Sequence, residues 1–83
     1  MKRKIDRIES SADDMTIVCK YECSKGDFTD VLIEAATLSK NIRSYPKNPI
    51  MDIIYVYAYV SFKPSNFETT LKTIKNIGFD FQG

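Results

Sequence analysis

The sequence predicts an α+β domain in which two helices cover one face of an antiparallel sheet. Three observations lead to this expectation. Apolar residues recur at helical spacing in two segments of similar length, and they alternate with polar residues in the segments around them. The third observation is length, because 83 residues are enough for one compact domain and not for two. We therefore expect residues 15–83 to form a single α+β domain, preceded by residues 1–14 as an N-terminal arm or an extra strand.

The first half of that domain is predicted to be a strand followed by a helix. Residues 15–23 form the strand, because apolar and polar side chains alternate along them. Residues 24–26 interrupt the alternation. Asp27 can then cap a helix that runs to about Asn41, since a carboxylate accepts hydrogen bonds from the amides of the first turn. The apolar stripe expected to face the core consists of Phe28, Leu32, Ala35, Leu38 and Ile42.

The strongest strand signal lies in the second half. Residues 42–45 form a short predicted strand, and Pro46 and Pro49 mark a loop after it. Residues 50–62 contain this strand signal, with alternation from Ile54 to Phe62, and Pro64 ends the strand. One face of this strand is expected to hold Ile54, Val56, Ala58, Val60 and Phe62, and the other Tyr55, Tyr57, Tyr59 and Ser61.

A second helix is predicted over residues 65–77, followed by a short strand at residues 79–81. Ser65 and Glu68 have the spacing of a capping box, and Gly78 is placed to end the helix in a left-handed conformation. The apolar stripe consists of Phe67, Leu71, Ile74 and Ile77. The resulting order, β-α-β-β-α-β, is that of the ferredoxin-like split βαβ architecture, which leaves one sheet face open.

Composition argues against catalytic and metal chemistry. The chain has no histidine, which removes the commonest general base and the usual zinc ligand. Cys19 and Cys23 would lie on one strand about 13 Å apart, which is too far for a disulfide. We expect Cys19 to be buried, Cys23 to be half-exposed and both to be reduced, as is typical of a cytoplasmic protein. The sequence therefore predicts a protein that is not an enzyme, needs no metal or cofactor, and does not bind a membrane.

Charge gives little support for a duplex-DNA binder. The formal net charge is +1, whereas phosphate neutralisation normally requires a clear basic excess. One basic cluster stands at the N-terminus and consists of Lys2, Arg3, Lys4 and Arg7. Two interpretations of this cluster stay open: a solvated terminus, or a basic arm that contacts phosphate or an acidic partner.

The alternating tyrosines are the predicted contact surface. Aromatic rings on an open sheet face can stack on nucleic-acid bases or anchor a protein partner. A residue from the neighbouring strand and lysines at the rim are expected to complete the surface. The predicted partner-binding residues are Tyr55, Tyr57, Tyr59, Val18, Lys20 and Lys63.

Residues 57–62, which read Tyr-Ala-Tyr-Val-Ser-Phe, match the closing positions of a known ribonucleoprotein signature. Through this match, residues 15–83 resemble the RNA recognition motif family. The resemblance implies a ferredoxin-like fold, single-stranded RNA as the partner, and stacking roles for Tyr57 and Tyr59. Val18 stands where the family has an aromatic residue in its first strand. The chain is also similar to ACT domains, which share the element order and have a loop glycine at the position of Gly26.

Two functions follow from these residues and stay open. The first is a protein-binding module, of the size and type of phage or mobile-element inhibitors that act on host defence proteins, such as anti-CRISPR proteins. The second is binding of single-stranded RNA. A positive rim around the tyrosines would favour RNA, and a neutral or acidic rim would favour protein. A homodimer formed through the same sheet face is a further alternative.

Overall fold

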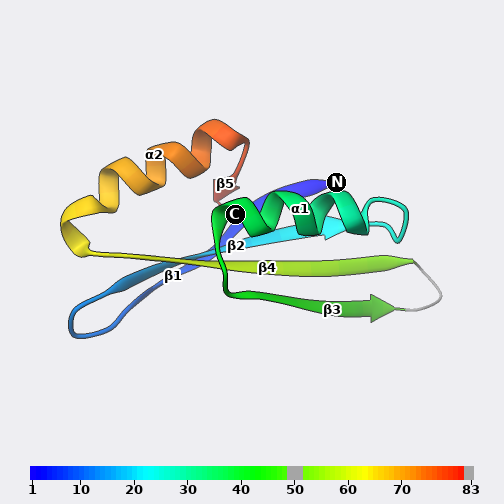
Figure 1. Ribbon diagram of the computed structural model, residues 1–83, viewed down its shortest axis with the longest axis horizontal. Helices are drawn as coiled ribbons and strands as arrows, with labels where there is room; N and C mark the ends of the chain where they lie inside the picture. The colour runs from blue at the N-terminus through cyan, green and yellow to red at the C-terminus, as the bar shows by residue number, and fades with distance from the viewer. Residues whose placement is uncertain (49–51, 82–83) are drawn as a thin grey trace.

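The computed structural model describes residues 1–48 and 52–81, and it shows one sheet with two helices packed on it (Figure 1). The elements in chain order are β1 (Lys2–Ser10), β2 (Met15–Cys23), α1 (Phe28–Leu38), β3 (Ile42–Asn48), β4 (Ile53–Phe62), the 3₁₀ turn η1 (Pro64–Asn66), α2 (Phe67–Ile77) and β5 (Asp80–Phe81). The predicted α+β class is confirmed. Both helices lie on the same side of the sheet and contribute residues to one core.

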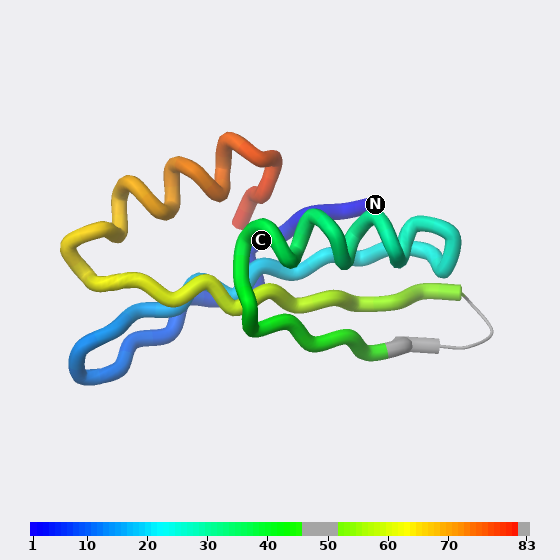
Figure 2. The backbone as a smooth tube through the Cα atoms, viewed as in Figure 1, coloured from blue at the N-terminus to red at the C-terminus, as the bar shows by residue number. Residues whose placement is uncertain are grey.

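The sheet has the order β3-β4-β2-β1-β5 and is mixed, not wholly antiparallel as predicted. β3, β4, β2 and β1 pair antiparallel in that sequence. The final pair is parallel, because β5 runs alongside β1 at Lys4 and Ile5. Figure 2 follows the blue N-terminal strand as it turns back into β2. β1 therefore occupies an interior position between β2 and β5.

A β-bulge in β1 explains how such a polar segment joins the sheet. The register with β2 shifts between Ile5 and Arg7, so that Asp6 is an extra residue. Ile5 pairs with Cys19 before the bulge, and Ile8 pairs with Ile17 after it. The bulge thus places two isoleucines three residues apart on the same sheet face, where regular alternation would separate them.

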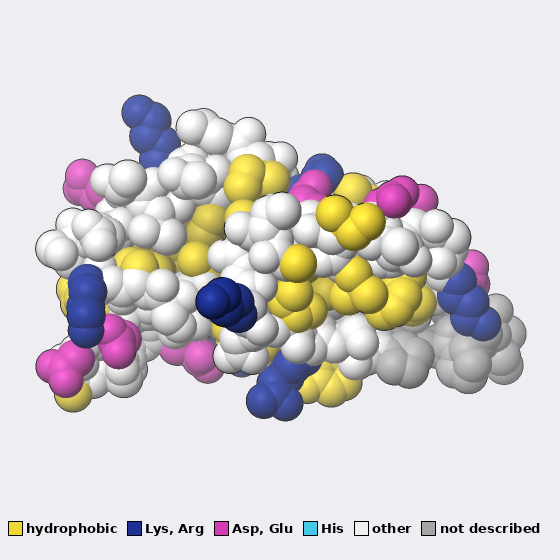
Figure 3. All heavy atoms as spheres, viewed as in Figure 1, with side chains coloured by type: hydrophobic (Ala, Val, Ile, Leu, Met, Phe, Trp, Pro, Cys, Tyr) yellow, Lys and Arg dark blue, Asp and Glu magenta, His cyan; other side chains and the backbone are white. Residues whose placement is uncertain are grey.

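The core lies between the sheet and the helices. Its buried members are Ile5, Ile17, Cys19, Tyr21, Cys23, Val31, Ala35, Val56, Ala58, Ile74 and Phe79. Cys23 is therefore buried, and the expectation that it is half-exposed was wrong. Figure 3 shows hydrophobic side chains on the surface between α1 and the strands below it, so the two helices do not close the core completely.

The helices bury a narrower stripe than predicted. In α1 the fully buried residues are Val31 and Ala35, whereas the predicted Phe28, Leu32 and Leu38 are only half-buried. α1 also ends at Leu38, three residues before the predicted end at Asn41. In α2 only Ile74 is fully buried. Each helix therefore packs along a single line of its surface.

The predicted caps are realised in part. Asp27 precedes α1 but has helical backbone angles, so its side chain does not cap the first turn; its amide donates instead to Ser24 Oγ at 3.3 Å. The capping box at Ser65 is absent because Ser65 belongs to η1. Gly78 ends α2 with φ 121°, as predicted.

The backbone of β3 continues beyond its predicted end. The strand includes Pro46, which pairs with Ile54 and was expected to begin a loop. A proline is compatible with this position because β3 is an edge strand. The predicted loop residue Pro49 lies outside the described residues. None of the helices within residues 1–48 and 52–81 has the length and apolar character needed to span a membrane.

Candidate interaction surface: the tyrosine face

The sheet face directed away from the helices carries a group of tyrosines, and we call it the tyrosine face. Alternation along β4 places Tyr55, Tyr57 and Tyr59 on this face, while Val56 and Ala58 point into the core and are fully buried. The three tyrosines are half-buried. The structure therefore brings these three predicted residues together in one row along β4.

The edge strand β3 adds a fourth tyrosine, which was not among the predicted contact residues. Tyr45 pairs with Tyr55 across the strands, and its side chain is 48% exposed. Its ring contacts Tyr57 edge to face, with 5.8 Å between the ring centroids and 71° between the ring planes. The alternation of Arg43 and Tyr45 was the available signal, but it became informative only once the register with β4 was known.

β2 contributes Lys20 and Val18, with different outcomes. The Lys20 ammonium lies 4.6 Å from the centroid of the Tyr55 ring, which is a cation–π distance. Val18 points toward the tyrosine face but is fully buried, between its cross-strand neighbours Arg7 and Tyr59. Val18 was expected to contact a partner, but its side chain is buried and cannot do so in this structure. It packs beneath the side chains that form the surface.

The predicted basic arm is an ordered strand whose charges point to both sheet faces. Arg3 lies on the helix side, where its Nε and Nη2 donate to Glu34 of α1 at 2.9 and 2.8 Å. Lys2 is 3.6 Å from Glu22. Lys4 is exposed and pairs with Lys20 across the strands. The cluster therefore does not act as one basic patch.

Arg7 is held on the tyrosine face by acidic neighbours. It forms ion pairs with Asp6 at 2.6 Å and with Glu9 at 3.1 Å. The hydrogen bond to Glu9, and to a smaller extent the one to Asp6, raises the pKa of the Arg7 guanidinium above its usual value. This part of the face is therefore close to neutral.

Lys63 lies apart from the tyrosines. It follows the end of β4 and forms an ion pair with Asp14 at 2.9 Å. It stands four residues beyond Tyr59, which corresponds to about 13 Å along an extended chain. Lys63 was expected at the rim of the contact surface, and the structure does not bring it next to the rings.

The surroundings of Tyr57 further disfavour ionisation of its hydroxyl group, as the direction of its pKa shift shows. Burial raises the pKa of Tyr57, and the negative charge of Asp6 raises it further. The hydroxyl is therefore available as a hydrogen-bond donor at neutral pH. A half-buried ring with a polar tip is a common feature of interface tyrosines.

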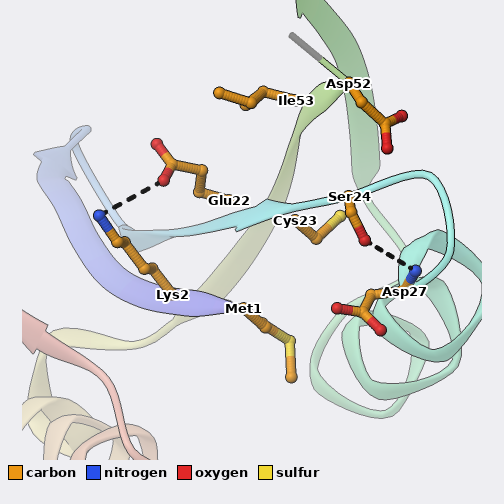
Figure 4. Close-up of a pocket in the computed structure, with 8 residues that line it drawn as sticks. All are labelled: Met1, Lys2, Glu22, Cys23, Ser24, Asp27, Asp52 and Ile53. Carbon is orange, nitrogen blue, oxygen red and sulfur yellow. Dashed lines mark hydrogen bonds and ion pairs between the residues drawn. The ribbon is translucent and has the colours of Figure 1, made fainter.

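A separate open pocket of about 330 Å³ lies at the end of the sheet where α1 begins (Figure 4). It is lined by Met1, Lys2, Glu22, Cys23, Ser24, Asp27, Asp52 and Ile53. Burial and the nearby Asp27 raise the pKa of Cys23, which makes its thiol a poor nucleophile. Within the part of the chain that the structure describes, no group of three His, Cys, Asp or Glu side chains is arranged to hold a metal ion.

Comparison with known proteins does not add to this picture. The chain matches no family model, and it matches none of the curated proteins or solved structures with which it was compared. The interpretation of the tyrosine face therefore depends on its own residues.

Proposed function

We propose that this chain is a small, non-catalytic protein-binding module that contacts its partner through the tyrosine face. The observation that supports this most directly is the cluster of Tyr45, Tyr55, Tyr57 and Tyr59 on a sheet face that neither α1 nor α2 covers. Tyrosine is enriched at protein interfaces and among the residues that dominate binding energy. A contiguous group of aromatic side chains that are at least partly exposed is typical of an interaction site.

The charges around the tyrosines favour a protein partner over RNA. Acidic and basic side chains are interspersed: Glu22 is paired with Lys2, and Arg7 is paired with Asp6 and Glu9. RNA binding depends on a positive surface that neutralises phosphates. A mixed rim suits the polar periphery of a protein interface.

Binding of single-stranded RNA is the second candidate. The positions of Tyr57 and Tyr59 on one face of a central strand support it, because such rings can stack on bases. A buried valine at position 18, where the RNA recognition motif family has a stacking aromatic, weakens it.

Three finer statements belong to this proposal. We regard the fold as a ferredoxin-like arrangement into which β1 is inserted beside β5, since β2, α1, β3, β4, α2 and β5 follow the expected order. The two free thiols support a reducing, cytoplasmic location. Inhibition of a host or defence protein is a role that such a small binding module could fill.

The experiment is affinity capture from lysate of the native cell, with and without nuclease treatment, followed by calorimetry with the purified partner. Tyr57→Ala should weaken binding by about 2 kcal/mol or more, roughly thirtyfold, because truncation of an interfacial anchor leaves its pocket unfilled. Ile33→Ala is the matched control, since Ile33 is 62% exposed on α1, away from the tyrosine face.

Circular dichroism melts would first establish that each variant is folded. Equal affinity of folded Tyr57→Ala and the unmodified protein would refute the proposed site. Loss of the captured partner after nuclease treatment would favour the RNA alternative. Capture of only the chain itself would favour a homodimer formed through this face.

A further inference from the structure

The strand register places three cations in one line across the tyrosine face. Arg43 of β3 pairs with Tyr57 of β4, Tyr57 pairs with Lys20 of β2, and Lys20 pairs with Lys4 of β1. Directly opposed residues on one sheet face have Cβ atoms about 5 Å apart, so this line extends over roughly 15 Å. We call Arg43, Tyr57, Lys20 and Lys4 the cationic row.

Two of the three cations stand side by side in the row. Lys4 and Lys20 are direct cross-strand neighbours, and like charges in this arrangement destabilise a sheet. The Lys20 ammonium lies over the Tyr55 ring, and Lys4 is exposed. At the other end of the row, Arg43 is also exposed. Positive charges therefore lie on either side of Tyr57; those of Arg43 and Lys4 are exposed, whereas Lys20 is half-buried.

Carboxylates bound the row on its remaining sides. Glu22 stands in the neighbouring row, opposite Tyr55, and Asp80 follows Lys4 on β5. On the other side, Asp6 and Glu9 accompany Arg7. The positive region is thus about one residue wide. A nucleic-acid strand has a phosphate at every nucleotide and would bring several of them beside these carboxylates, whereas a peptide can place acidic side chains only where cations lie.

We propose that the partner is a protein that presents an acidic segment to the cationic row. Aspartate or glutamate side chains of that segment bind Arg43 on one side of Tyr57 and Lys20 with Lys4 on the other. The Arg43 guanidinium can hold a carboxylate with two parallel hydrogen bonds. The apolar part of the segment covers the Tyr57 ring. This inference rests on the protein-binding function proposed above and specifies the chemistry of the partner.

Charge complementarity is testable with model ligands before the partner is known. Acetylated hexaglutamate, hexalysine and hexauridylate would be titrated into the isotopically labelled protein and followed by NMR. Hexaglutamate should shift the amide signals of Arg43, Tyr57, Lys20 and Lys4, and hexalysine should not. Arg43→Glu should weaken hexaglutamate binding roughly tenfold, because it replaces an attraction by a repulsion. Lys72→Glu makes the same charge change on the exposed surface of α2 and should have little effect.

Two results would overturn the acidic-segment proposal. One is hexaglutamate binding that is absent or that maps away from the cationic row. The other is tighter binding of hexauridylate at the same residues, which would indicate RNA.

The captured partner separates this inference from the proposed function. If Tyr57→Ala loses the partner while Arg43→Glu and Lys4→Glu retain it, the acidic segment is wrong and the tyrosine face stands. If all three folded variants retain the partner, both proposals are wrong. Loss of binding in Tyr57→Ala, Arg43→Glu and Lys4→Glu, with Lys72→Glu unchanged, supports both.

Discussion

Single side chains on the tyrosine face divide into those that form the surface and those that support it. Tyr45 exposes nearly half of its side chain, and Tyr57 contacts it edge to face. Val18 lies on the same side of the sheet but is completely covered. The rings therefore lie against buried side chains, which limits their conformational freedom, and this would favour the proposed binding function. Side chains that are already held in place lose less conformational entropy on binding.

The two thiols give a prediction at this scale. Burial raises the pKa of Cys19 to about 12, and burial and Asp27 raise the pKa of Cys23. Thiolates, the reactive species, are therefore scarce at pH 8. The native protein should react slowly with dithiobis-nitrobenzoate, and denaturation without reductant should release both thiols quickly.

Free cysteine, assayed under the same conditions, calibrates the rate of the fast reaction. Rapid modification of the native protein would contradict the described burial. Fewer than two reactive thiols in the denatured, unreduced chain would mean that a disulfide forms.

Sequence patterns revealed the tyrosines of β4 because a long strand displays its own period. Tyr55, Tyr57 and Tyr59 alternate with apolar residues, and this alone assigns them to one face. Tyr45 and Arg43 could not be placed in the same way, since their position depends on pairing with β4. The burial of Val18 depends on neighbours from two other strands, which no local pattern encodes.

Among the elements, β1 departs most from what its composition suggests. It has few apolar residues, and their spacing fits a strand only because the bulge at Asp6 resets the alternation. Periodicity without the bulge places Ile5 and Ile8 on opposite faces. The sequence therefore predicted either an arm or an extra strand for residues 1–14. In the structure, β1 lies inside the sheet.

The interior position of β1 predicts that its single buried isoleucine is important for stability. Ile5 is 1% exposed and belongs to the core. Ile5→Ala should lower the free energy of unfolding by about 2–5 kcal/mol, as deletion of a buried side chain generally does. Lys4→Ala changes the adjacent residue on the opposite face and should leave stability within about 0.5 kcal/mol.

Urea denaturation of both variants and the unmodified protein measures the difference. A loss of less than about 1 kcal/mol for Ile5→Ala would show that the first strand is not part of the core. A comparable loss in both variants would instead point to a general effect on strand pairing.

On the scale of the whole molecule, the sheet separates the core from the proposed contact surface. Its helix side holds the core, where Tyr21 and Phe79 contact edge to face with 5.1 Å between their centroids. Its other side holds the tyrosine face and the cationic row. This division permits substitutions on one side with limited effect on the other. The element order and the two faces could be predicted from sequence, but the insertion of β1 could not, because a parallel pair with β5 joins the two ends of the chain.

The contact between Arg3 and Glu34 links the first strand to α1 and gives the last prediction, on pH dependence. Hydrogen bonds from Arg3 lower the pKa of Glu34 below its usual value. A carboxylate with a lowered folded-state pKa stabilises the protein above its unfolded pKa of about 4.3, and this contribution is lost as the pH falls through the folded pKa. Both side chains are 28% exposed, so solvent screening limits the contribution to about 1 kcal/mol.

Glu34→Gln should therefore lower the free energy of unfolding by about 1 kcal/mol at pH 7 and by much less at a pH below the lowered folded-state pKa of Glu34, where this group is protonated in both states. Denaturant melts across this pH range measure the difference. Glu9→Gln is the matched control, because Glu9 pairs with Arg7 at a more exposed position and should contribute less. A loss for Glu34→Gln that is the same at both pH values would mean that the side chain stabilises the protein by packing alone. The ion pair between Arg3 and Glu34 would then contribute nothing to the stability of the contact between β1 and α1.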